Sequence, residues 1–151
     1  MEYENLVGKP FELGKQDCFS AFKDIYKQNF NIDVPDFARP TDWNSDNLDL
    51  IGKLYPMVGM EVIEGWDLRP GDVLATAIGT SKPNHLVIYV GDNTIFHHKT
   101  NALSCAESWR PFWKMVTCYV LRHPDVPDLT PVLPDVTIES LLENRYTMGN
   151  V

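Results

Sequence analysis

The apolar positions divide the chain into a helical first part and a strand-rich second part. Residues 17–30 carry apolar side chains at helical spacing, and these are Phe22, Ile25, Tyr26 and Phe30. Asp17 precedes this stripe, and its carboxylate can accept a backbone N–H of the first turn, so the pattern predicts a helix capped by Asp17. A second, shorter helix is predicted around Asp46–Leu54, ending before Pro56.

From Val62 the pattern becomes typical of strands. The segment Leu68–Asp72 contains the turn signal Pro-Gly-Asp and precedes a run of strand-forming residues. The predicted strands cover residues 73–78, 85–90, 94–97 and 117–121. A helix followed by an antiparallel sheet predicts an α+β fold.

The character of the chain changes after His123. Proline recurs at positions 124, 127, 131 and 134, which disfavours a helix or an interior strand. A short amphipathic piece follows, with Ile138, Leu141 and Leu142 on one face. We therefore expect one domain over residues 1–123 and a Pro-rich arm over residues 124–151. The arm either docks on this domain or on a partner, or is a disordered terminus.

Composition narrows the functional classes. The 151 residues carry a formal net charge of −8 and no basic stripe, which argues against nucleic-acid binding as the main role. No stretch is long and apolar enough to predict a membrane span. The first residues do not resemble a secretory signal, so we expect synthesis and folding in a cytoplasm. Three widely spaced cysteines do not form a disulfide framework.

Cys18 is the first candidate for chemistry, because it lies in the first turn of the predicted helix. Backbone N–H groups that lack helical partners, together with the positive end of the helix dipole, stabilise a thiolate at such a position. The alternative is that Cys18 is a small core side chain, as most cysteines are. We interpret Cys105 and Cys118 as core residues, since Cys118 falls in the middle of a predicted strand.

His85 begins a predicted strand, and a second histidine follows on the next strand. If residues 91–93 form a three-residue loop, His97 lies on the same sheet face as His85 and diagonal to it. If only residues 92–93 turn, His98 takes that place, because a slip of one residue exchanges the two faces. Strand pairing from sequence alone leaves His97 and His98 as alternatives.

A thiol and two imidazoles are sufficient for nucleophilic acyl transfer. In such a site His85 takes the proton of Cys18 and returns one to the leaving amine, while the second histidine fixes the tautomer of His85. Asp17 and Asp92 are carboxylates close in sequence, but neither has a spacing that requires this role. The same residue types bind zinc, yet the chain has no CxxC or HExxH pattern and no clear fourth ligand, so we expect no metal site.

Three segments resemble the NlpC-type (NlpC/p60) cysteine peptidases of the papain-like superfamily. Asp17–Ser20 is similar to the "DCSG" nucleophile motif, Arg69–Leu74 to the "PGD" strand entry, and His85–Asn93 to the "HVGIYxGxG" strand and turn. In the family pattern, the polar third member of the catalytic set lies twelve positions after the histidine, and the residue at that position here is His97. The resemblance covers about residues 6–123. It implies a fold in which an N-terminal helix carrying the cysteine packs on an antiparallel sheet.

The lead segment Gly8–Cys18, the approach Pro83–His85 and the double histidine resemble the NlpC-like tail assembly proteins of long-tailed bacteriophages. The resemblance implies a catalytic set of Cys18, His85 and His97 with no cofactor. It also implies hydrolysis of amide bonds in peptidoglycan stem peptides, typically next to D-glutamate, or in a tail protein during assembly. Other tail-tip proteins are then the expected partners, and the virion tail is the expected location.

Two positions depart from the family pattern. Many members have a tyrosine in the lead segment whose hydroxyl helps to build the oxyanion hole, and the matching residue here is Phe11. The usual small residue after the cysteine is replaced by Phe19. A tail-associated peptidase is the first hypothesis. The second is a structural subunit of the tail tip with a weak or vestigial site, in which the Pro-rich arm holds its neighbours.

Overall fold

A computed structural model describes residues 1–45, 48–130, 138–139 and 142 of the chain. Its described helical elements are η1 (Glu4–Leu6), α1 (Cys18–Phe30), α2 (Leu50–Leu54), η2 (Pro56–Val58) and α3 (Pro111–Val116). Its described strands are β1 (Glu61–Ile63), β2 (Val73–Thr76), β3 (His85–Gly91), β4 (Thr94–His97), β5 (Cys105–Ser108) and β6 (Thr117–Arg122). Within the described ranges, no helix is long and apolar enough to cross a membrane.

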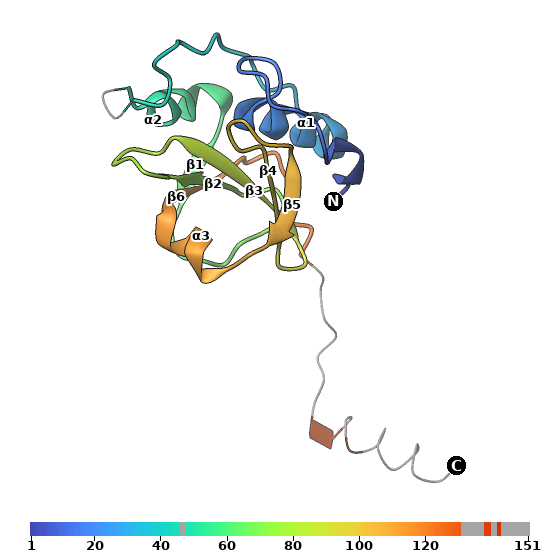
Figure 1. The fold of residues 1–151 in the computed structure, drawn as a ribbon. Helices are drawn as coiled ribbons and strands as arrows, with labels where there is room; N and C mark the ends of the chain where they lie inside the picture. The colour runs from blue at the N-terminus through green and yellow to red at the C-terminus, as the bar shows by residue number, and fades with distance from the viewer. Residues whose placement is uncertain (46–47, 131–137, 140–141, 143–151) are drawn as a thin grey trace.

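The strands form one antiparallel sheet in the order β1-β6-β2-β3-β4-β5. Figure 1 shows α1 and α2 on one side of this sheet and α3 on the other. The predicted α+β fold, with an N-terminal helix packed on an antiparallel sheet, is therefore confirmed.

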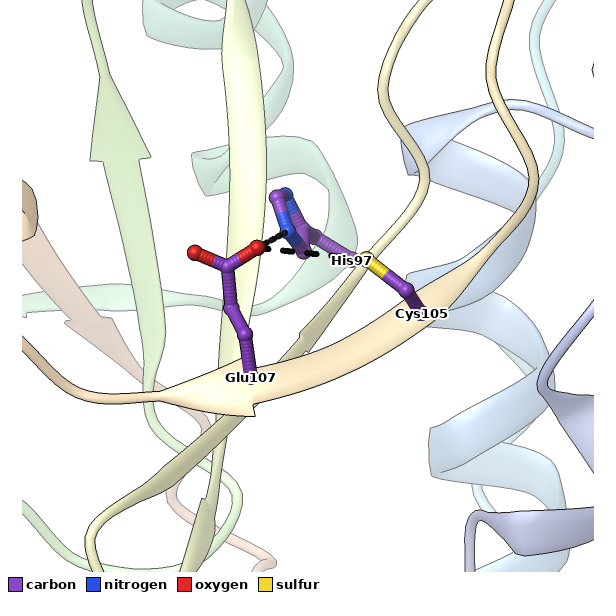
Figure 2. Close-up of side chains that lie close together, drawn as sticks. All are labelled: His97, Cys105 and Glu107. Carbon is purple, nitrogen blue, oxygen red and sulfur yellow. Dashed lines mark hydrogen bonds and ion pairs between the residues drawn. The ribbon is translucent and has the colours of Figure 1, made fainter.

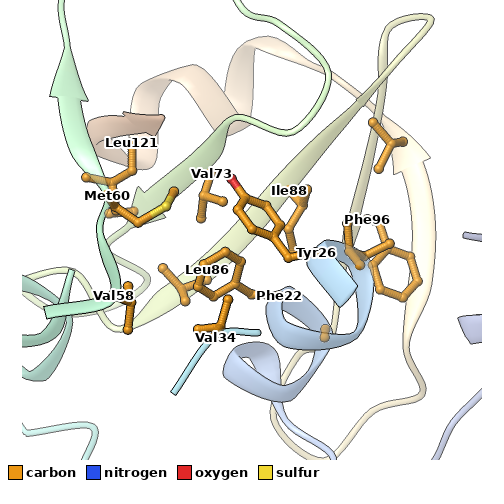
Figure 3. Close-up of a cluster of buried hydrophobic side chains, with 14 of the residues drawn as sticks. Phe22, Tyr26, Val34, Val58, Met60, Val73, Leu86, Ile88, Phe96 and Leu121 are labelled. Carbon is orange, nitrogen blue, oxygen red and sulfur yellow. The ribbon is translucent and has the colours of Figure 1, made fainter. Parts of the chain in front are cut away.

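The main core lies between α1 and the central strands. Of the predicted helical stripe, Phe22, Ile25 and Tyr26 are buried and Phe30 is partly buried. They pack against side chains of the sheet that include Val73, Leu86, Ile88 and Phe96 (Figure 3). The buried Tyr26 hydroxyl donates a hydrogen bond of 2.6 Å to the carbonyl of Gly71, so its polar end is satisfied as buried groups require. This packing fixes α1, and therefore its first turn, over β3.

A second core lies on the opposite face of the sheet. Trp113 from α3 is buried there with Leu74, Val87, Ile95 and Val120. Alternation along β3 thus divides its side chains between the two cores, with Leu86 and Ile88 in the main core and Val87 in the second core.

Several element boundaries differ from the predictions. The second helix begins at Leu50, because the Asp49 carboxylate caps it by accepting a hydrogen bond from the N–H of Gly52. A start near Asp46 was predicted, and residues 46–47 lie outside the described ranges. Strand β2 ends at Thr76, whereas the predicted strand extended to Ile78. The N–H of Ile78 donates a hydrogen bond to the side-chain oxygen of Asn84 and so does not continue the strand. The sequence did not predict β5 or α3.

The predicted Pro-rich arm is described only in part. Val126 lies beside Gly71, and Asp128 forms an ion pair with Arg69 at 3.6 Å. Residues 131–137, 140–141 and 143–151 lie outside the described residues, as does Leu141 of the predicted amphipathic piece. The division into residues 1–123 and 124–151 stays a prediction.

Candidate active site

Cys18 is the first residue of α1, and the structure confirms Asp17 as the helix cap. The Asp17 carboxylate accepts the backbone N–H of Ser20 at 2.9 Å and that of Gly14, also at 2.9 Å. One side chain therefore fixes both the start of the helix and the loop that leads into it. This places the Cys18 thiol, which is half-buried, at the edge of the main core.

Asp17 also forms a buried ion pair with Arg39, which comes from the connection after α1. The two contacts between guanidinium and carboxylate measure 3.0 and 3.1 Å, and both side chains are only 6% exposed. Burial raises the pKa of Asp17, but the Ser20 N–H and Arg39 outweigh it and hold the pKa below its ordinary value. Arg39 also lies over the ring of Phe19 and pairs with Asp36. The arginine is therefore neutralised inside the protein.

The Cys18 thiol is neutral at rest, which differs from the sequence-based expectation of a thiolate. Burial raises its pKa to about 11, the Asp17 carboxylate adds to this, and the N–H groups of Leu86 and Phe19 with Arg39 oppose it. The first turn of α1 does act in the expected direction. Its effect is smaller than the cost of placing a charge in an apolar surrounding.

His97, and not His98, lies opposite Val87 on the neighbouring strand, on the same sheet face as His85. The turn itself contains only Asp92 and Asn93, which would have favoured His98. A β-bulge between Tyr89 and Gly91 inserts one residue into β3 and restores the register expected of a three-residue loop. The predicted link between turn length and histidine was therefore wrong, because it omitted the bulge.

The two histidines and a glutamate form a continuous hydrogen-bonded chain. His85 Nε2 lies 2.9 Å from His97 Nδ1, and His97 Nε2 lies 3.1 Å from a carboxylate oxygen of Glu107. The other oxygen of Glu107 accepts hydrogen bonds from Arg110 at 2.8 Å and from the Trp113 indole at 2.9 Å. The Trp113 ring lies edge-on to His97, so the chain is packed as well as bonded.

The charge states of these hydrogen-bonded groups determine the tautomers of His85 and His97. Burial raises the pKa of Glu107, but hydrogen bonds from His97, Arg110 and Trp113 lower it to about 2. Burial lowers the pKa of His97, and burial together with His97 lowers that of His85 to about 3. An ionised carboxylate can only accept, so His97 Nε2 carries the hydrogen and its Nδ1 accepts from His85 Nε2–H. The Nδ1 lone pair of neutral His85 is then left to accept a proton.

Sequence reasoning missed Glu107. It considered Asp17 and Asp92 as carboxylate partners, but Asp17 is paired with Arg39 and Asp92 lies exposed at the β3–β4 turn. Glu107 reaches His97 because β5 pairs with β4, and β5 was not predicted. The sequence did contain a signal for Glu107. If residues 105–108 are taken as a strand paired with β4, Cys105 and Glu107 are two positions apart and therefore lie on the same sheet face as His97.

Cys18 and His85 line a single cleft, which also includes Phe11 and His98. His98 does not join the hydrogen-bonded chain, because its Nε2 bonds the carbonyl of Ala102 at 2.9 Å. The ring of Phe11 lies edge-on to His98 at a centroid distance of 5.8 Å. The structure thus brings the predicted residues Cys18, His85 and His97 to one region.

The donor atoms of His97, Cys105 and Glu107 lie within 4.8 Å of one another (Figure 2). Nitrogen, sulfur and oxygen donors of this kind suit a zinc ion, and the spacing rules applied to the sequence did not foresee the group. However, both oxygens of Glu107 already accept hydrogen bonds inside the protein. The bonding therefore fits a chain of hydrogen bonds better than a metal site.

All three cysteines are free thiols, as the absence of a disulfide framework predicted. Cys118 is exposed, so its predicted core role was wrong. The register of β6 against β2 shifts at this point, with Thr76 opposite Thr117 and Ala75 opposite Tyr119, so Cys118 is the extra, bulged residue. Cys105 is only half-buried at the edge strand β5.

Residues 8–122 match the model of the NlpC/P60 family. The chain belongs to this family. It is 35% identical to Tail tip assembly protein K of Escherichia phage lambda over 119 residues. These aligned residues cover 79% of this chain and 59% of the phage lambda protein. It is 25% identical over 123 residues to Tail tip assembly protein K of Escherichia phage N15, covering 80% of this chain and 50% of that protein. The chain thus spans between half and three-fifths of these relatives.

The resting thiol gives a testable pH dependence. In a Cys105→Ser, Cys118→Ser variant, we expect the rate of iodoacetamide labelling of Cys18 to keep rising with pH beyond about pH 9. The reason is that the thiolate fraction grows about tenfold per pH unit until the pKa of about 11 is reached. Mass spectrometry after timed quenching measures the rate, with N-acetylcysteine as the reference thiol. A plateau below about pH 8 would show a thiolate at rest and contradict this assignment.

Proposed function

We propose that this protein is a thiol peptidase that acts in a phage tail. Its reaction is hydrolysis of an amide bond, in peptidoglycan stem peptides or in a tail protein during assembly, with Cys18 as nucleophile, His85 as base and His97 as the residue that orients it. The proposal rests on one observation above the others. A hydrogen-bonded chain from Glu107 through His97 ends at His85, which lines the same cleft as Cys18.

The proposed reaction begins with a neutral thiol and a neutral imidazole. The Cys18 sulfur attacks the amide carbonyl carbon while its proton passes to Nδ1 of His85. The tetrahedral adduct then breaks its C–N bond, the leaving amine takes the proton from His85, and the acyl group remains on sulfur as a thioester. Water attacks the thioester with His85 as base, which releases the carboxylic acid and returns a proton to Cys18.

Glu107 matters most when His85 is charged. Burial disfavours an imidazolium at this position, so the proton transfer from Cys18 is costly unless the charge is spread along the chain. His97 accepts from His85 and donates to the Glu107 carboxylate, which stabilises the cation as the third member of a triad does. The ion pair of Glu107 with Arg110 keeps the carboxylate in place.

The oxyanion of the adduct needs hydrogen-bond donors. The backbone N–H of Cys18, in the first turn of α1, is one donor without an intrahelical partner. Phe11 has no hydroxyl to supply another, and the loss of one such donor costs on the order of 10²–10³ in rate. We therefore propose a slow peptidase.

The first prediction for this function is a graded loss of hydrolysis. Cys18→Ala abolishes release of new amino groups from purified peptidoglycan and from a tail-protein substrate, because no nucleophile remains. Glu107→Gln lowers kcat by about 10–100-fold with little change in KM, since it removes a charge-assisted hydrogen bond worth about 1.5–3 kcal/mol to the cationic state. Amine-reactive labelling of the products measures both effects.

Two variants serve as controls for this series. Glu107→Asp retains the carboxylate and is expected to recover part of the lost rate. Glu61→Gln removes the same charge from the exposed edge strand β1 and is expected to have no effect. Full activity of Cys18→Ala would refute the peptidase, and equal losses in Glu107→Gln and Glu61→Gln would refute the role of Glu107.

A second candidate function is a structural subunit of the tail tip. The observation that favours it is that both relatives are named for tail tip assembly. In this case other tail proteins are the partners, the virion tail is the location, and the Pro-rich arm holds the neighbours. Phe11 in place of a donor is consistent with a site that no longer turns over.

Truncation separates the two functions in a phage that encodes this protein. Ending the chain after residue 130 keeps Val126 beside Gly71 and the Asp128–Arg69 ion pair, so the domain is expected to fold. For a structural subunit, the truncated chain yields no complete tails by electron microscopy, whereas Cys18→Ala yields infectious particles. Normal tails from the truncated chain would count against the structural function.

A further inference from the structure

His97, Cys105 and Glu107 present three metal-ligand types on one face of the sheet. Cys105 lies directly opposite His97 on the neighbouring strand. Glu107 follows two positions along β5, so strand alternation places all three side chains on the same face (Figure 2). None of the three lines the cleft beside Cys18. An ion held by this cluster therefore does not occupy the cleft.

The spacing of the donor atoms suits a tetrahedral ion. His97 Nε2 lies 3.1 Å and Cys105 Sγ lies 4.0 Å from the same oxygen of Glu107, Oε2. Zinc bonds of about 2.0–2.3 Å at tetrahedral angles keep neighbouring donor atoms about 3.4–3.6 Å apart. The two observed distances lie on either side of this range, so small side-chain adjustments bring all three donors to one ion.

The chemistry of the donors also selects the ion. An imidazole, a thiolate and a carboxylate are all zinc ligands, and the two anionic groups together balance the charge of a divalent ion. A thiolate disfavours hard ions such as Mg²⁺, which take oxygen ligands. Water can fill the fourth position. The cluster therefore suits zinc or a similar divalent transition metal.

Binding of the ion exchanges a single hydrogen bond of Glu107. Its Oε2 accepts a hydrogen bond from His97 Nε2, and the ion replaces this bond. Its Oε1 retains the hydrogen bonds from Arg110 and Trp113, which hold the carboxylate in place as outer partners of a metal ligand do. The hydrogen-bonded chain from Glu107 to His85 is thus the state without the ion.

The surroundings of the cluster favour reversible binding. His97 is fully buried, whereas Cys105 and Glu107 are partly exposed on the edge strand, which gives an ion a way in. Arg110 pairs with Glu107. The charge of Lys99 acts on both His97 and Cys105. These two cations oppose a further positive charge, so we expect an ion that can be removed by a chelator.

We propose that His97, Cys105 and Glu107 form an inhibitory site for zinc or a similar divalent transition metal. The ion takes the Nε2 lone pair of His97, and the thiol proton of Cys105 is released to water. The hydrogen on His85 Nε2 passes to His97 Nδ1 across the 2.9 Å contact. Through water, His85 takes up at Nδ1 the proton displaced from His97 Nε2. No lone pair is then left on His85 Nδ1 to accept the proton of Cys18.

The inhibitory effect rests on the proposed function, because it assumes that His85 takes the proton of Cys18. Binding of the ion and reversal of the tautomers do not require catalysis. Both are therefore measured on the full chain carrying Cys18→Ala, which also removes any zinc held between the Cys18 thiol and His85.

Co²⁺ reports the ligands of the site, because a thiolate ligand gives this ion a charge-transfer band. In the Cys18→Ala chain, Cys105→Ser is expected to abolish this band and to weaken zinc binding at least about tenfold by calorimetry. Even outer partners of a metal site contribute about 10–100-fold to affinity, and a direct ligand contributes no less. Cys118→Ser is the matched control at an exposed cysteine outside the cluster, and it is expected to change neither result.

Long-range ¹H–¹⁵N spectra of the Cys18→Ala chain report the ring hydrogens. Zinc is expected to move the hydrogens of His85 and His97 from Nε2 to Nδ1, and a chelator is expected to return them. Mg²⁺ at the same concentration is expected to change neither ring. This comparison needs no variant of the cluster, so it decides even if Cys105→Ser does not fold by circular dichroism.

Inhibition is measured on the chain with Cys18 intact. Zinc is expected to lower kcat with little change in KM, because the ion leaves the cleft open. Cys105→Ser is expected to need at least about tenfold more zinc for the same inhibition, and Cys118→Ser is expected to need no more than the unaltered chain.

Absence of a thiolate band, a band that persists in a folded Cys105→Ser variant, or hydrogens that stay on Nε2 in the presence of zinc would overturn the proposal. Equal inhibition of the chains with and without Cys105 would overturn the inhibitory role. Failure of the peptidase is a separate result, because it appears as absence of hydrolysis before zinc is added. The band and the tautomers then still decide whether the site exists.

Discussion

The hydrogen bond between His97 and the Glu107 carboxylate is the interaction on which the candidate site depends. A carboxylate cannot donate, so this bond fixes the hydrogen on His97 Nε2 and, one step further, on His85 Nε2. Without it, either neutral tautomer of each ring is available. With it, the Nδ1 lone pair of His85 is kept ready for a proton. The position of the hydrogens along this series of bonds is therefore set by Glu107, on the edge strand β5.

Burial sets both the stability and the chemistry of this region. Packing of α1 on the sheet fixes the first turn of the helix, and the ion pair of Asp17 with Arg39 fixes the loops around it. The same apolar surrounding raises the pKa of Cys18 and lowers that of His85, so both groups are neutral at rest. In the proposed reaction the separation of their charges has to be stabilised, and the hydrogen-bonded chain to Glu107 can do this.

The sequence predicted most of the fold and only part of the site. Helical spacing and an aspartate cap predicted α1 closely, because burial and capping are local signals. The register of His97 depended on a bulge at the end of β3, where Gly91 has a φ of 96°, and the strand pairing predicted from the sequence did not include a bulge at this glycine. Glu107 was missed because β5 is a short edge strand without a buried alternating face. Cys118 was misplaced for a similar reason, since a bulge turned it outward.

The tautomers of the two histidines test the central claim most directly. Long-range ¹H–¹⁵N correlation spectra of histidine-labelled protein near neutral pH distinguish protonated from unprotonated ring nitrogens, with His85→Gln and His97→Gln variants for assignment. The account predicts that His85 and His97 are both neutral with the hydrogen on Nε2, and that Glu107→Gln mixes the tautomers. A hydrogen on Nδ1 of either ring in the unaltered protein, or a doubly protonated His85, would contradict it.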